Sequence, residues 1–252
     1  MNGGPLLRLA GLTKDFGGVR AVDRVTLELR PGESLGVIGP NGSGKTTLVN
    51  LITGYVKPTE GEVWLRDRRI TGRPPYRIAR LGVGRTFQMA KPFYHLPAYK
   101  NLVVPLTSPR VRGLEGGRYG DRDAAALDLL EDVGFERDSA IPYRPASVLP
   151  HGYVKRLELA QCLALRPDLL ILDELFSGLS LAEVGSTVPL IEKLQGEGRA
   201  IVMIEHRLRE LFRIVDRVVV LNFGQVIADG SPAEVMESDA VKKAYLGFED
   251  AS

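Results

Sequence analysis

The first third of the chain reads as short strands joined by tight turns. Residues 6–12 and 25–29 have strand patterns, the second alternating apolar and polar positions, and the run at 34–38 is typical of a buried strand. Pro31-Gly32-Glu33 and Pro58-Thr59-Glu60-Gly61 are turn sequences, and a short strand at 62–65 follows the second one. We expect these early strands to form an antiparallel sheet beside a larger core.

The last third alternates strand and helix patterns. Apolar runs at 169–172, 200–204 and 217–221 are separated by helical patterns at 181–194, where we expect Pro189 to cause a kink, and at 207–212. This alternation predicts a parallel sheet with right-handed crossovers. A hairpin turn at 222–225 then leads to a strand at 226–228, and 232–247 is helical in pattern.

The middle of the chain differs in character. From 89 to about 143 prolines and glycines are frequent, with one long helical pattern at 122–133, and a second helix is expected at 152–165. Shorter elements, a helix at 76–81 and a strand at 82–87, precede this region. We therefore predict one α/β domain over 1–252, with a mixed core sheet and antiparallel β subdomain in 1–88 and 166–252 and an inserted helical subdomain in 89–165.

Composition narrows the function classes. The chain has 252 residues, 44% hydrophobic and 25% charged, and its net charge of +2 gives no reason to expect a nucleic-acid partner. The single cysteine, Cys162, cannot form an internal disulfide, suits a reducing cytoplasm, and is best explained as a small buried hydrophobe. No apolar run approaches about 18 residues and no signal peptide is evident, so we expect any membrane role to come through a partner.

One motif carries specific chemistry. The stretch after the strand at 34–38 fits G-x-x-x-x-G-K-[ST], the P-loop pattern, and a helix beginning at Thr47 follows it. Glycines let successive N–H groups turn inward as an anion nest, and the helix N-terminus adds partial positive charge. We expect Lys45 to reach the β- and γ-phosphates of ATP and the Thr46 hydroxyl to take a Mg²⁺ position. A glycine-rich turn with a chance lysine is the alternative, which the strand–loop–helix context disfavours. The predicted nucleotide-binding residues are Gly39, Pro40, Asn41, Gly42, Ser43, Gly44, Lys45, Thr46 and Thr47.

Two later strands deliver polar residues. The strand at 169–172 ends in Asp173 and Glu174, which strand alternation would aim in different directions, allowing Asp173 to hold Mg²⁺ through water and Glu174 to polarise the attacking water. A solvated acidic pair is the alternative. The strand at 200–204 delivers His206 to the same edge, where it could hydrogen-bond the γ-phosphate, although a lone histidine is more often structural.

In order and spacing, these motifs resemble the ATP-binding subunits of ABC transporters, and the resemblance covers nearly the whole chain. It implies the P-loop NTPase fold of ABC ATPases, with Gln88 touching Mg²⁺ and the attacking water and Phe16 stacking on adenine; an ordinary packing role for Phe16 is the alternative. It also implies two partners, a second ATPase subunit and transmembrane permease subunits, and a place at the cytoplasmic face of the membrane.

Finer details point to one branch of the family. The segments at 84–88, 204–208 and 244–247 look like the ATPase subunits of branched-chain amino acid importers. Urea and short-amide importers use closely similar subunits, so the transported solute stays open. The resemblance places the permease contact after Gln88, at Phe93, Tyr94, Leu96 and Tyr99, unless these side chains pack inside the subdomain.

The chain departs from the family at its signature. Leu-Ser-Gly-Gly-Gln aligns with Leu149, Pro150, His151, Gly152 and Tyr153, and proline has neither a hydroxyl nor an N–H to offer the phosphate bound by the opposite subunit. Losing a hydrogen bond to a charged group costs about 1.5–3 kcal/mol. We therefore predict a heterodimer whose partner has an intact signature, in which this chain's own ATP is hydrolysed faster and the ATP facing Pro150 turns over slowly.

Two smaller departures affect subunit communication: Leu175 replaces the proline after the catalytic glutamate, and Ser180 replaces the usual aspartate or asparagine of the D-loop. Together these changes keep a regulatory or weakly hydrolysing ATP-binding protein open as an alternative. A soluble ABC protein acting on nucleic acid or ribosomes is disfavoured by the single cassette and short insertion. A small-molecule kinase is disfavoured by Gln88 and His206 together.

Overall fold

The computed structural model describes residues 4–86, 92–114 and 121–246. The chain divides into two compact units, unit 1 comprising Met1–Ile78 and Leu194–Ser252, and unit 2 comprising Ala79–Lys193. These packing units differ in extent from the predicted subdomains, whose limits stay a prediction. Within the described part, no helix is long and apolar enough to cross a membrane.

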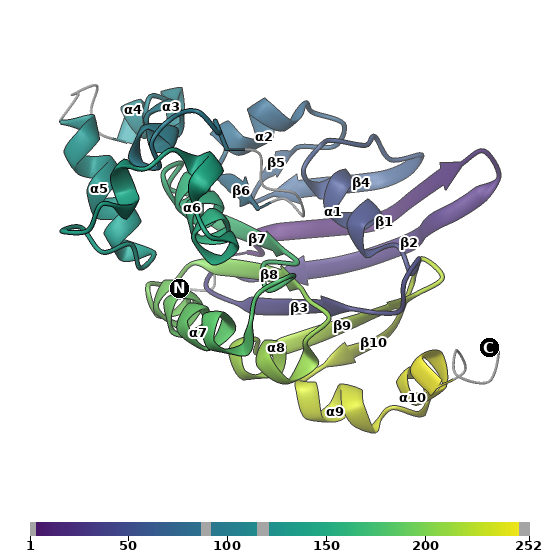
Figure 1. Cartoon of the computed structure of the whole chain (residues 1–252). Helices are drawn as coiled ribbons and strands as arrows, with labels where there is room; N and C mark the ends of the chain where they lie inside the picture. The colour runs from purple at the N-terminus through teal and green to yellow at the C-terminus, as the bar shows by residue number, and fades with distance from the viewer. Residues whose placement is uncertain (1–3, 87–91, 115–120, 247–252) are drawn as a thin grey trace. The chain divides into compact units, whose positions relative to one another are not determined.

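Unit 1 contains the predicted antiparallel sheet. Strands β1 (Leu7–Phe16), β2 (Val19–Leu29), β4 (Glu60–Leu65) and β5 (Arg68–Arg69) are ordered β2-β1-β4-β5, and β1 and β2 form the long hairpin of Figure 1. Both hairpin strands are longer than predicted, since pairing continues to Phe16 opposite Val19 and the Gly17-Gly18 turn has positive φ at both residues. Register shifts along the hairpin interrupt the period-two pattern, which explains why the sequence underestimated its length.

Unit 1 also contains parallel strands that position the P-loop. Strand β3 (Ser34–Ile38) lies between β8 (Ala200–Ile204) and β9 (Arg217–Asn222) and is parallel to both, and β10 (Gln225–Gly230) adds antiparallel to β9. Every residue of β3 and β8 is buried, as expected for parallel strands covered on both faces. Helix α1 (Lys45–Ile52) follows the P-loop and begins two residues earlier than predicted, while α8 (Leu208–Ile214) follows β8.

The C-terminal segment is helical, as predicted, but in two pieces. Helix α9 (Pro232–Glu237) has a capping box between Ser231 and Glu234, and α10 (Asp239–Leu246) follows after Ser238 takes an extended conformation. Both helices bury apolar side chains, Val235 from α9 and Val241 and Ala244 from α10, and α9 packs on β9 and β10.

Unit 2 consists of a short strand pair and a helical region. Strands β6 (Val83–Arg85) and β7 (Leu169–Asp173) are parallel, with Arg85 opposite Ile171. Helix α7 (Leu181–Gly196) continues past unit 2 and runs without interruption through Pro189. The helices expected at 122–133 and 152–165 are present. They are α5 (Arg122–Asp132) and α6 (His151–Leu163). Helix α2 (Pro75–Arg80) crosses from unit 1 into unit 2, and the other described helical elements of unit 2 are η1 (Tyr99–Leu102), α3 (Val103–Leu106), α4 (Pro109–Leu114), η2 (Ile141–Tyr143) and η3 (Ala146–Val148).

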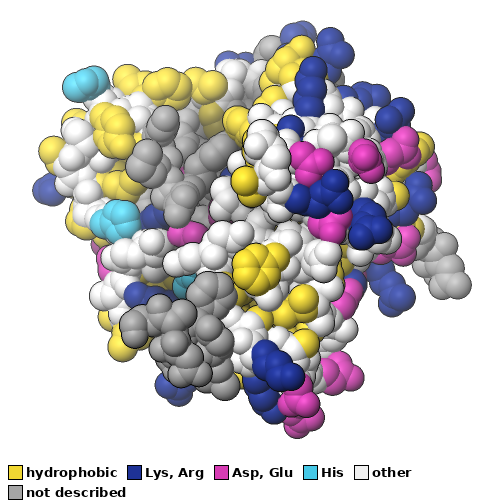
Figure 2. Space-filling view, turned by 90° about the vertical axis from the view of Figure 1, so that its right-hand side faces the viewer, with side chains coloured by type: hydrophobic (Ala, Val, Ile, Leu, Met, Phe, Trp, Pro, Cys, Tyr) yellow, Lys and Arg dark blue, Asp and Glu magenta, His cyan; other side chains and the backbone are white. Residues whose placement is uncertain are grey.

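Charged side chains of both signs are interspersed on the face drawn in Figure 2. Within unit 1, Arg217 is paired with both Asp229 and Glu33.

Candidate functional site

The P-loop backbone is shaped so that only glycine fits at its key positions. Gly39, Gly42 and Gly44 have φ of 150°, 78° and 104°, the left-handed side of the map that other residues rarely adopt. A Cβ on Gly39 would lie 2.1 Å from the Leu221 carbonyl oxygen, and one on Gly44 would lie 2.3 Å from the Ala21 carbonyl oxygen. Neighbouring backbone therefore occupies the space that side chains would need, which fixes the loop's curl.

Lys45 closes the loop from inside. Its ammonium donates hydrogen bonds to the carbonyl oxygens of Gly39 at 2.7 Å and Pro40 at 2.9 Å, and the residue is only 7% exposed. A cation held at the mouth of a curled loop is suited to receive phosphate oxygens. Helix α1 begins at this lysine with no side-chain cap at Gly44 and no acidic residue in its first turn, so its N-terminus matches an anionic ligand. Thr46, in that same turn, is exposed.

Two other segments hold the loop from outside. The backbone N–H of Gly224, in the turn between β9 and β10, donates to the Ser43 carbonyl at 2.9 Å. The Gly224 carbonyl in turn accepts from the N–H of Asp23 on β2 at 2.9 Å. The start of β2 and the β9–β10 turn thus contact each other and the P-loop, which brings the β1–β2 hairpin next to the nucleotide loop.

The hairpin carries Phe16 at its tip, 46% exposed, with the Lys14 ammonium 4.8 Å from the centre of its ring. An exposed aromatic at a hairpin tip fits the predicted stacking role better than a packing role, although the role itself stays a prediction.

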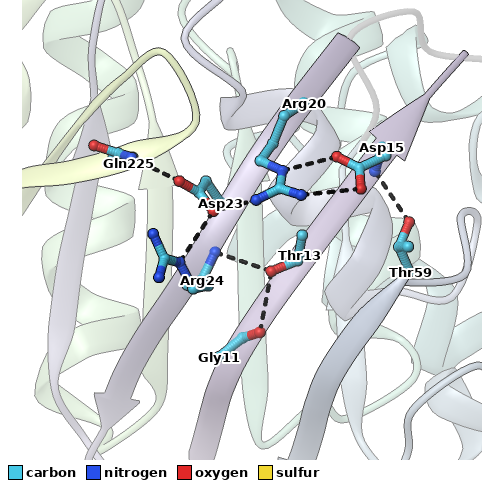
Figure 3. Close-up of polar contacts among 8 residues, drawn as sticks. All are labelled: Gly11, Thr13, Asp15, Arg20, Asp23, Arg24, Thr59 and Gln225. Carbon is cyan, nitrogen blue, oxygen red and sulfur yellow. Dashed lines mark hydrogen bonds and ion pairs between the residues drawn. The ribbon is translucent and has the colours of Figure 1, made fainter. Parts of the chain in front are cut away.

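A polar network braces this hairpin (Figure 3). Arg20 on β2 contacts Asp15 at 2.9 Å and Asp23 at 3.1 Å, and Gln225 from the β9–β10 hairpin donates to Asp23 at 2.6 Å. The N–H of Asp15 donates to the Thr59 hydroxyl at 3.0 Å. Hydrogen bonds from Gln225, Arg20 and Arg24 hold the pKa of Asp23 below its ordinary value. Sequence reasoning missed this network because its members are ordinary surface residues.

His206 leaves β8 at the edge where the P-loop leaves β3. Val37 of β3 lies opposite Ile204 of β8 in the parallel register, so Gly39 and His206 each follow two residues later on neighbouring strands. His206 is exposed at this edge, whereas Glu205 before it is buried. The prediction that this strand delivers a histidine to the P-loop edge agrees with the register.

A residue outside the predicted set also reaches the P-loop. The Tyr245 phenol, on α10, forms a hydrogen bond with the backbone of Gly39. This bond favours the ionised phenol, so the backbone group is the N–H donor, while burial raises the pKa of Tyr245 above its ordinary value. The sequence contains a signal for this contact, because Tyr245 lies in the 244–247 segment that resembles the branched-chain amino acid importer subunits.

In unit 2, the acidic pair follows β7. Asp173 is the last strand residue, is 2% exposed and pairs with Arg85 at 2.7 Å. Glu174 is half-buried and has a φ of 51°, in the left-handed region. Strand alternation, the reason predicted for the two carboxylates to diverge, does not apply here, because Glu174 lies beyond the end of β7. The positive φ of Glu174 sets the direction of its side chain instead. Such a conformation in a non-glycine residue costs about 1–3 kcal/mol and is characteristic of functional sites.

The segment aligned with the signature opens α6. Pro150 is the N-cap residue and provides no side-chain cap. His151 Nε2 lies 3.3 Å from the Ser177 carbonyl oxygen, and a Cβ on Gly152 would lie 2.3 Å from Glu183 Oε1. Tyr153 packs edge-on against Phe135, with ring centres 4.9 Å apart. Leu149 is buried beneath. These substitutions are therefore absorbed by contacts within unit 2.

Ser180 and Glu183 form a compact pair next to this segment. The Glu183 carboxylate accepts from the Ser180 N–H at 2.8 Å and from its hydroxyl at 2.7 Å, and these bonds hold the pKa of Glu183 below its ordinary value. The Ser180 hydroxyl is consequently committed within its own unit.

The chemistry of the donors fits ATP and Mg²⁺. The curled loop, its lysine and the open helix start suit phosphates, and the Thr46 hydroxyl and Asp173 carboxylate are the hard oxygen ligands that Mg²⁺ prefers. No group of three or more His, Cys, Asp or Glu side chains gathers as a metal site among the described residues. Gln88 lies outside the described residues, so its role stays a prediction.

Comparison with known proteins identifies this architecture. The family model described as ABC transporter matches residues 22–177, and the model described as branched-chain amino acid ATP-binding cassette transporter matches 225–249. The chain is 39% identical to the high-affinity branched-chain amino acid transport ATP-binding protein LivG of Salmonella typhimurium, covering 96% of this chain and 98% of that protein. It is 38% identical, with the same coverage, to BraF of Pseudomonas aeruginosa, a transport ATP-binding protein of the same description.

Solved structures agree. The ADP conformation of MJ1267, an ATP-binding cassette of an ABC transporter, matches with a TM-score of 0.84 and 29% identity over 96% of this chain and 99% of that one. The dimeric post-hydrolysis structure of the cassette MJ0796, bound to ADP and Pi, matches with a TM-score of 0.77 and 25% identity over 90% and 98%. The predicted fold and family resemblance are confirmed. This chain belongs to the ABC transporter family as an ATP-binding cassette that hydrolyses ATP.

Proposed function

We propose that this chain is the ATP-hydrolysing subunit of an importer for branched-chain amino acids, held at the cytoplasmic face of a membrane by permease subunits. The observation that carries the ATPase is the P-loop, where backbone leaves no room for a Cβ at Gly39 or Gly44 and where Lys45 is hydrogen-bonded to two loop carbonyls. The choice of solute is supported by the names of the relatives LivG and BraF and by the C-terminal family match at 225–249.

Each site residue has a role within this proposal. Lys45 and the loop N–H groups bind phosphate, and Phe16 stacks on the base. Thr46, Asp173 and Gln88 hold Mg²⁺, which when bound supplies charge neutralisation at the phosphates. Glu174 orients the attacking water and accepts its proton, and His206 hydrogen-bonds the γ-phosphate. Positioning and electrostatics, rather than covalent chemistry, do the catalysis.

The proposed partners are a second ATPase subunit and the permease. A dimeric cassette is known for MJ0796, and the signature segment at 149–153 is the part of this chain that would face a nucleotide on the other subunit. Pro150 gives that face no hydroxyl, which favours a heterodimer in which this chain's own ATP meets an intact signature.

The permease contact is proposed at an exposed apolar surface. Phe93, Tyr94 and Leu96 are 50%, 48% and 42% exposed, whereas Tyr99 is half-buried with its ring 5.6 Å from that of Tyr143. Phe93, Tyr94 and Leu96 are therefore suited to contact another protein. Tyr99 instead packs within unit 2, which is the alternative considered for these residues.

This surface supplies the test of the proposal. The chain would be reconstituted in liposomes with permease subunits, its ATPase partner and the solute-binding protein, and ATP-driven uptake of labelled leucine measured. We expect uptake with the native chain and loss of at least about tenfold in Tyr94→Asp/Leu96→Asp, with nucleotide binding unchanged, because charges would have to be buried at the interface.

Tyr76→Asp, a change at an equally exposed tyrosine in unit 1, is the matched control and should transport normally. Unchanged uptake in the double variant would place the permease contact elsewhere. Uptake of urea but not leucine would replace the proposed solute while keeping the ATPase.

The weakly hydrolysing alternative retains one supporting observation, the proline at the N-cap of α6. The reconstituted complex distinguishes it, since a regulatory subunit would bind ATP without turnover that depends on Glu174.

A further inference from the structure

Two oppositely charged side chains meet at the ends of β6 and β7, inside unit 2. Arg85 is the last residue of β6 and Asp173 the last of β7, and the register of Arg85 opposite Ile171 puts Asp173 two residues further along. Arg85 Nη2 and Asp173 Oδ2 are 2.7 Å apart, and the two side chains are only 8% and 3% exposed. A carboxylate this deeply buried is stable as an anion only when paired.

The backbone next to this pair is held on both sides. The N–H of Thr86 donates to the Ile171 carbonyl at 3.0 Å, and the N–H of Asp173 donates to the Thr86 hydroxyl at 3.1 Å. Thr86 is completely buried. These hydrogen bonds fix the backbone of Arg85 and of Asp173 relative to each other. The ion pair between the two side chains therefore has little freedom to change its geometry.

The helix that begins at the signature segment is joined to the same strand end. Cys162, on α6, donates its thiol to the Arg85 carbonyl at 2.9 Å. Burial raises the pKa of this thiol well above its ordinary value, so the thiol keeps its proton and remains a donor. Arg85 therefore contacts β7 through its side chain and α6 through its backbone.

We propose that Arg85 is a positioning residue for Asp173: its guanidinium keeps one carboxylate oxygen occupied, so that the other is presented in a fixed direction to the water shell of Mg²⁺. This inference rests on the proposed role of Asp173 as a metal ligand. Groups that orient metal-binding carboxylates typically change metal affinity by about 10- to 100-fold when removed. A buried ion pair adds little to the free energy of unfolding, because the cost of removing two charges from water is about as large as their mutual attraction. Stability alone is therefore a weak explanation for this pair.

The test measures the contribution of Mg²⁺ to nucleotide binding rather than turnover. ADP and ATP affinities of the purified chain would be determined by calorimetry with Mg²⁺ and with excess chelator, for the native protein, Arg85→Gln, Arg85→Lys and Asp173→Asn. The Mg²⁺ gain is the ratio of the nucleotide affinity with Mg²⁺ to the affinity with chelator. We expect the affinity without metal to change by less than about twofold in the Arg85 variants. In Arg85→Gln the Mg²⁺ gain should fall roughly tenfold. Asp173→Asn should lose the same gain, and adding Arg85→Gln to it should cause no further loss.

Arg85→Lys keeps a cation beside the buried Asp173 carboxylate, so the protein is expected to stay folded. Lysine lacks the planar guanidinium that fixes the direction of the carboxylate. It should retain part of the Mg²⁺ gain. Arg110→Gln is the matched control, because Arg110 pairs with Asp168 at 3.1 Å in the same unit and should leave the gain intact.

The outcomes distinguish a failure of the proposed role of Arg85 from a failure of the proposed metal role of Asp173. If Asp173→Asn loses the Mg²⁺ gain while Arg85→Gln and Arg85→Lys keep it, Arg85 has only a structural role and the inference is wrong, with the proposed function untouched. If Asp173→Asn also keeps the gain, the proposed metal role of Asp173 fails first. A lower melting temperature in the Arg85 variants with an unchanged Mg²⁺ gain also counts against the inference.

Discussion

The P-loop of unit 1 and the signature segment of unit 2 are built in different ways. The P-loop owes its shape to backbone, since glycines with positive φ lie against the main chain of neighbouring strands and Lys45 is bound to two carbonyls. The signature segment depends on side chains, with His151 against Ser177 and Glu183 over Gly152. A backbone-built site tolerates little substitution, because an added Cβ on Gly39 or Gly44 meets main chain and a side chain at Gly42 would have to adopt a strained positive φ. A side-chain-built segment can exchange residues as long as its neighbours repack.

This contrast explains which family residues the chain keeps. The whole P-loop motif is present, whereas only Leu149 and Gly152 of the signature remain, Gly152 at a position where an added Cβ would lie 2.3 Å from Glu183 Oε1. Pro150, His151 and Tyr153 differ from the family signature, and two of them have partners within unit 2, His151 at the Ser177 carbonyl and Tyr153 at the Phe135 ring. We therefore expect variants of the P-loop to abolish function and variants of the signature segment to change its rate.

The largest expected effect breaks the backbone-built site. Lys45→Ala should weaken ATP binding by about 100- to 10,000-fold, because the ammonium can make two hydrogen bonds to charged phosphates worth about 1.5–3 kcal/mol each. Calorimetric titration with ATP measures this. Lys57→Ala, at an exposed lysine of the same unit, should bind ATP normally, and retained binding in Lys45→Ala would refute the phosphate role.

The next effect separates binding from chemistry. Glu174→Gln should leave ATP affinity within about threefold of the native value but lower steady-state turnover by at least about 100-fold, since an amide cannot accept the proton of the attacking water. Phosphate release assays on the complex give the rate, and Glu237→Gln on α9 is the control. Native turnover in Glu174→Gln would show that another residue acts as the base.

Pro150→Ser sharpens the comparison from the other side. Restoring a hydroxyl should raise turnover by roughly 10- to 100-fold if the purified chain self-associates, because both sites would regain a hydrogen bond of about 1.5–3 kcal/mol to phosphate. In a heterodimer the change should matter less, because this chain's own ATP faces the partner's signature. A vigorous homodimer that Pro150→Ser leaves unchanged would contradict the predicted asymmetry.

The smallest expected effect tests the contact of the Tyr245 side chain with the P-loop backbone at Gly39. Tyr245→Phe removes the hydroxyl that accepts from the Gly39 N–H, and a neutral hydrogen bond is worth about 0.5–1.5 kcal/mol. ATP affinity should fall by about two- to tenfold, measured by the same titration. Tyr55→Phe, at an exposed tyrosine of the same unit, should have no effect, and an equal loss there would remove the significance of the α10 contact.

The sequence predicted local features well and contacts between distant segments poorly. The strand at 34–38 and the helix at 122–133 were found because a buried strand and an amphipathic helix have patterns within a few residues. The hairpin of β1 and β2 was underestimated, because its register shifts disturb the period. The break at Ser238 was missed, since one extended residue leaves no pattern in a helical segment.

What the sequence alone determined was the nucleotide loop and the family, because the positive φ that favours glycine at Gly39 and Gly44 and the position of Lys45 between strand and helix are local features. The tertiary structure decided what surrounds these residues. It put β8 beside β3 so that His206 follows at the P-loop edge, paired Arg85 with Asp173, and brought Tyr245 to Gly39. These pairs are far apart in the chain, and their choice depends on strand order and packing, which no pattern of neighbouring residues encodes.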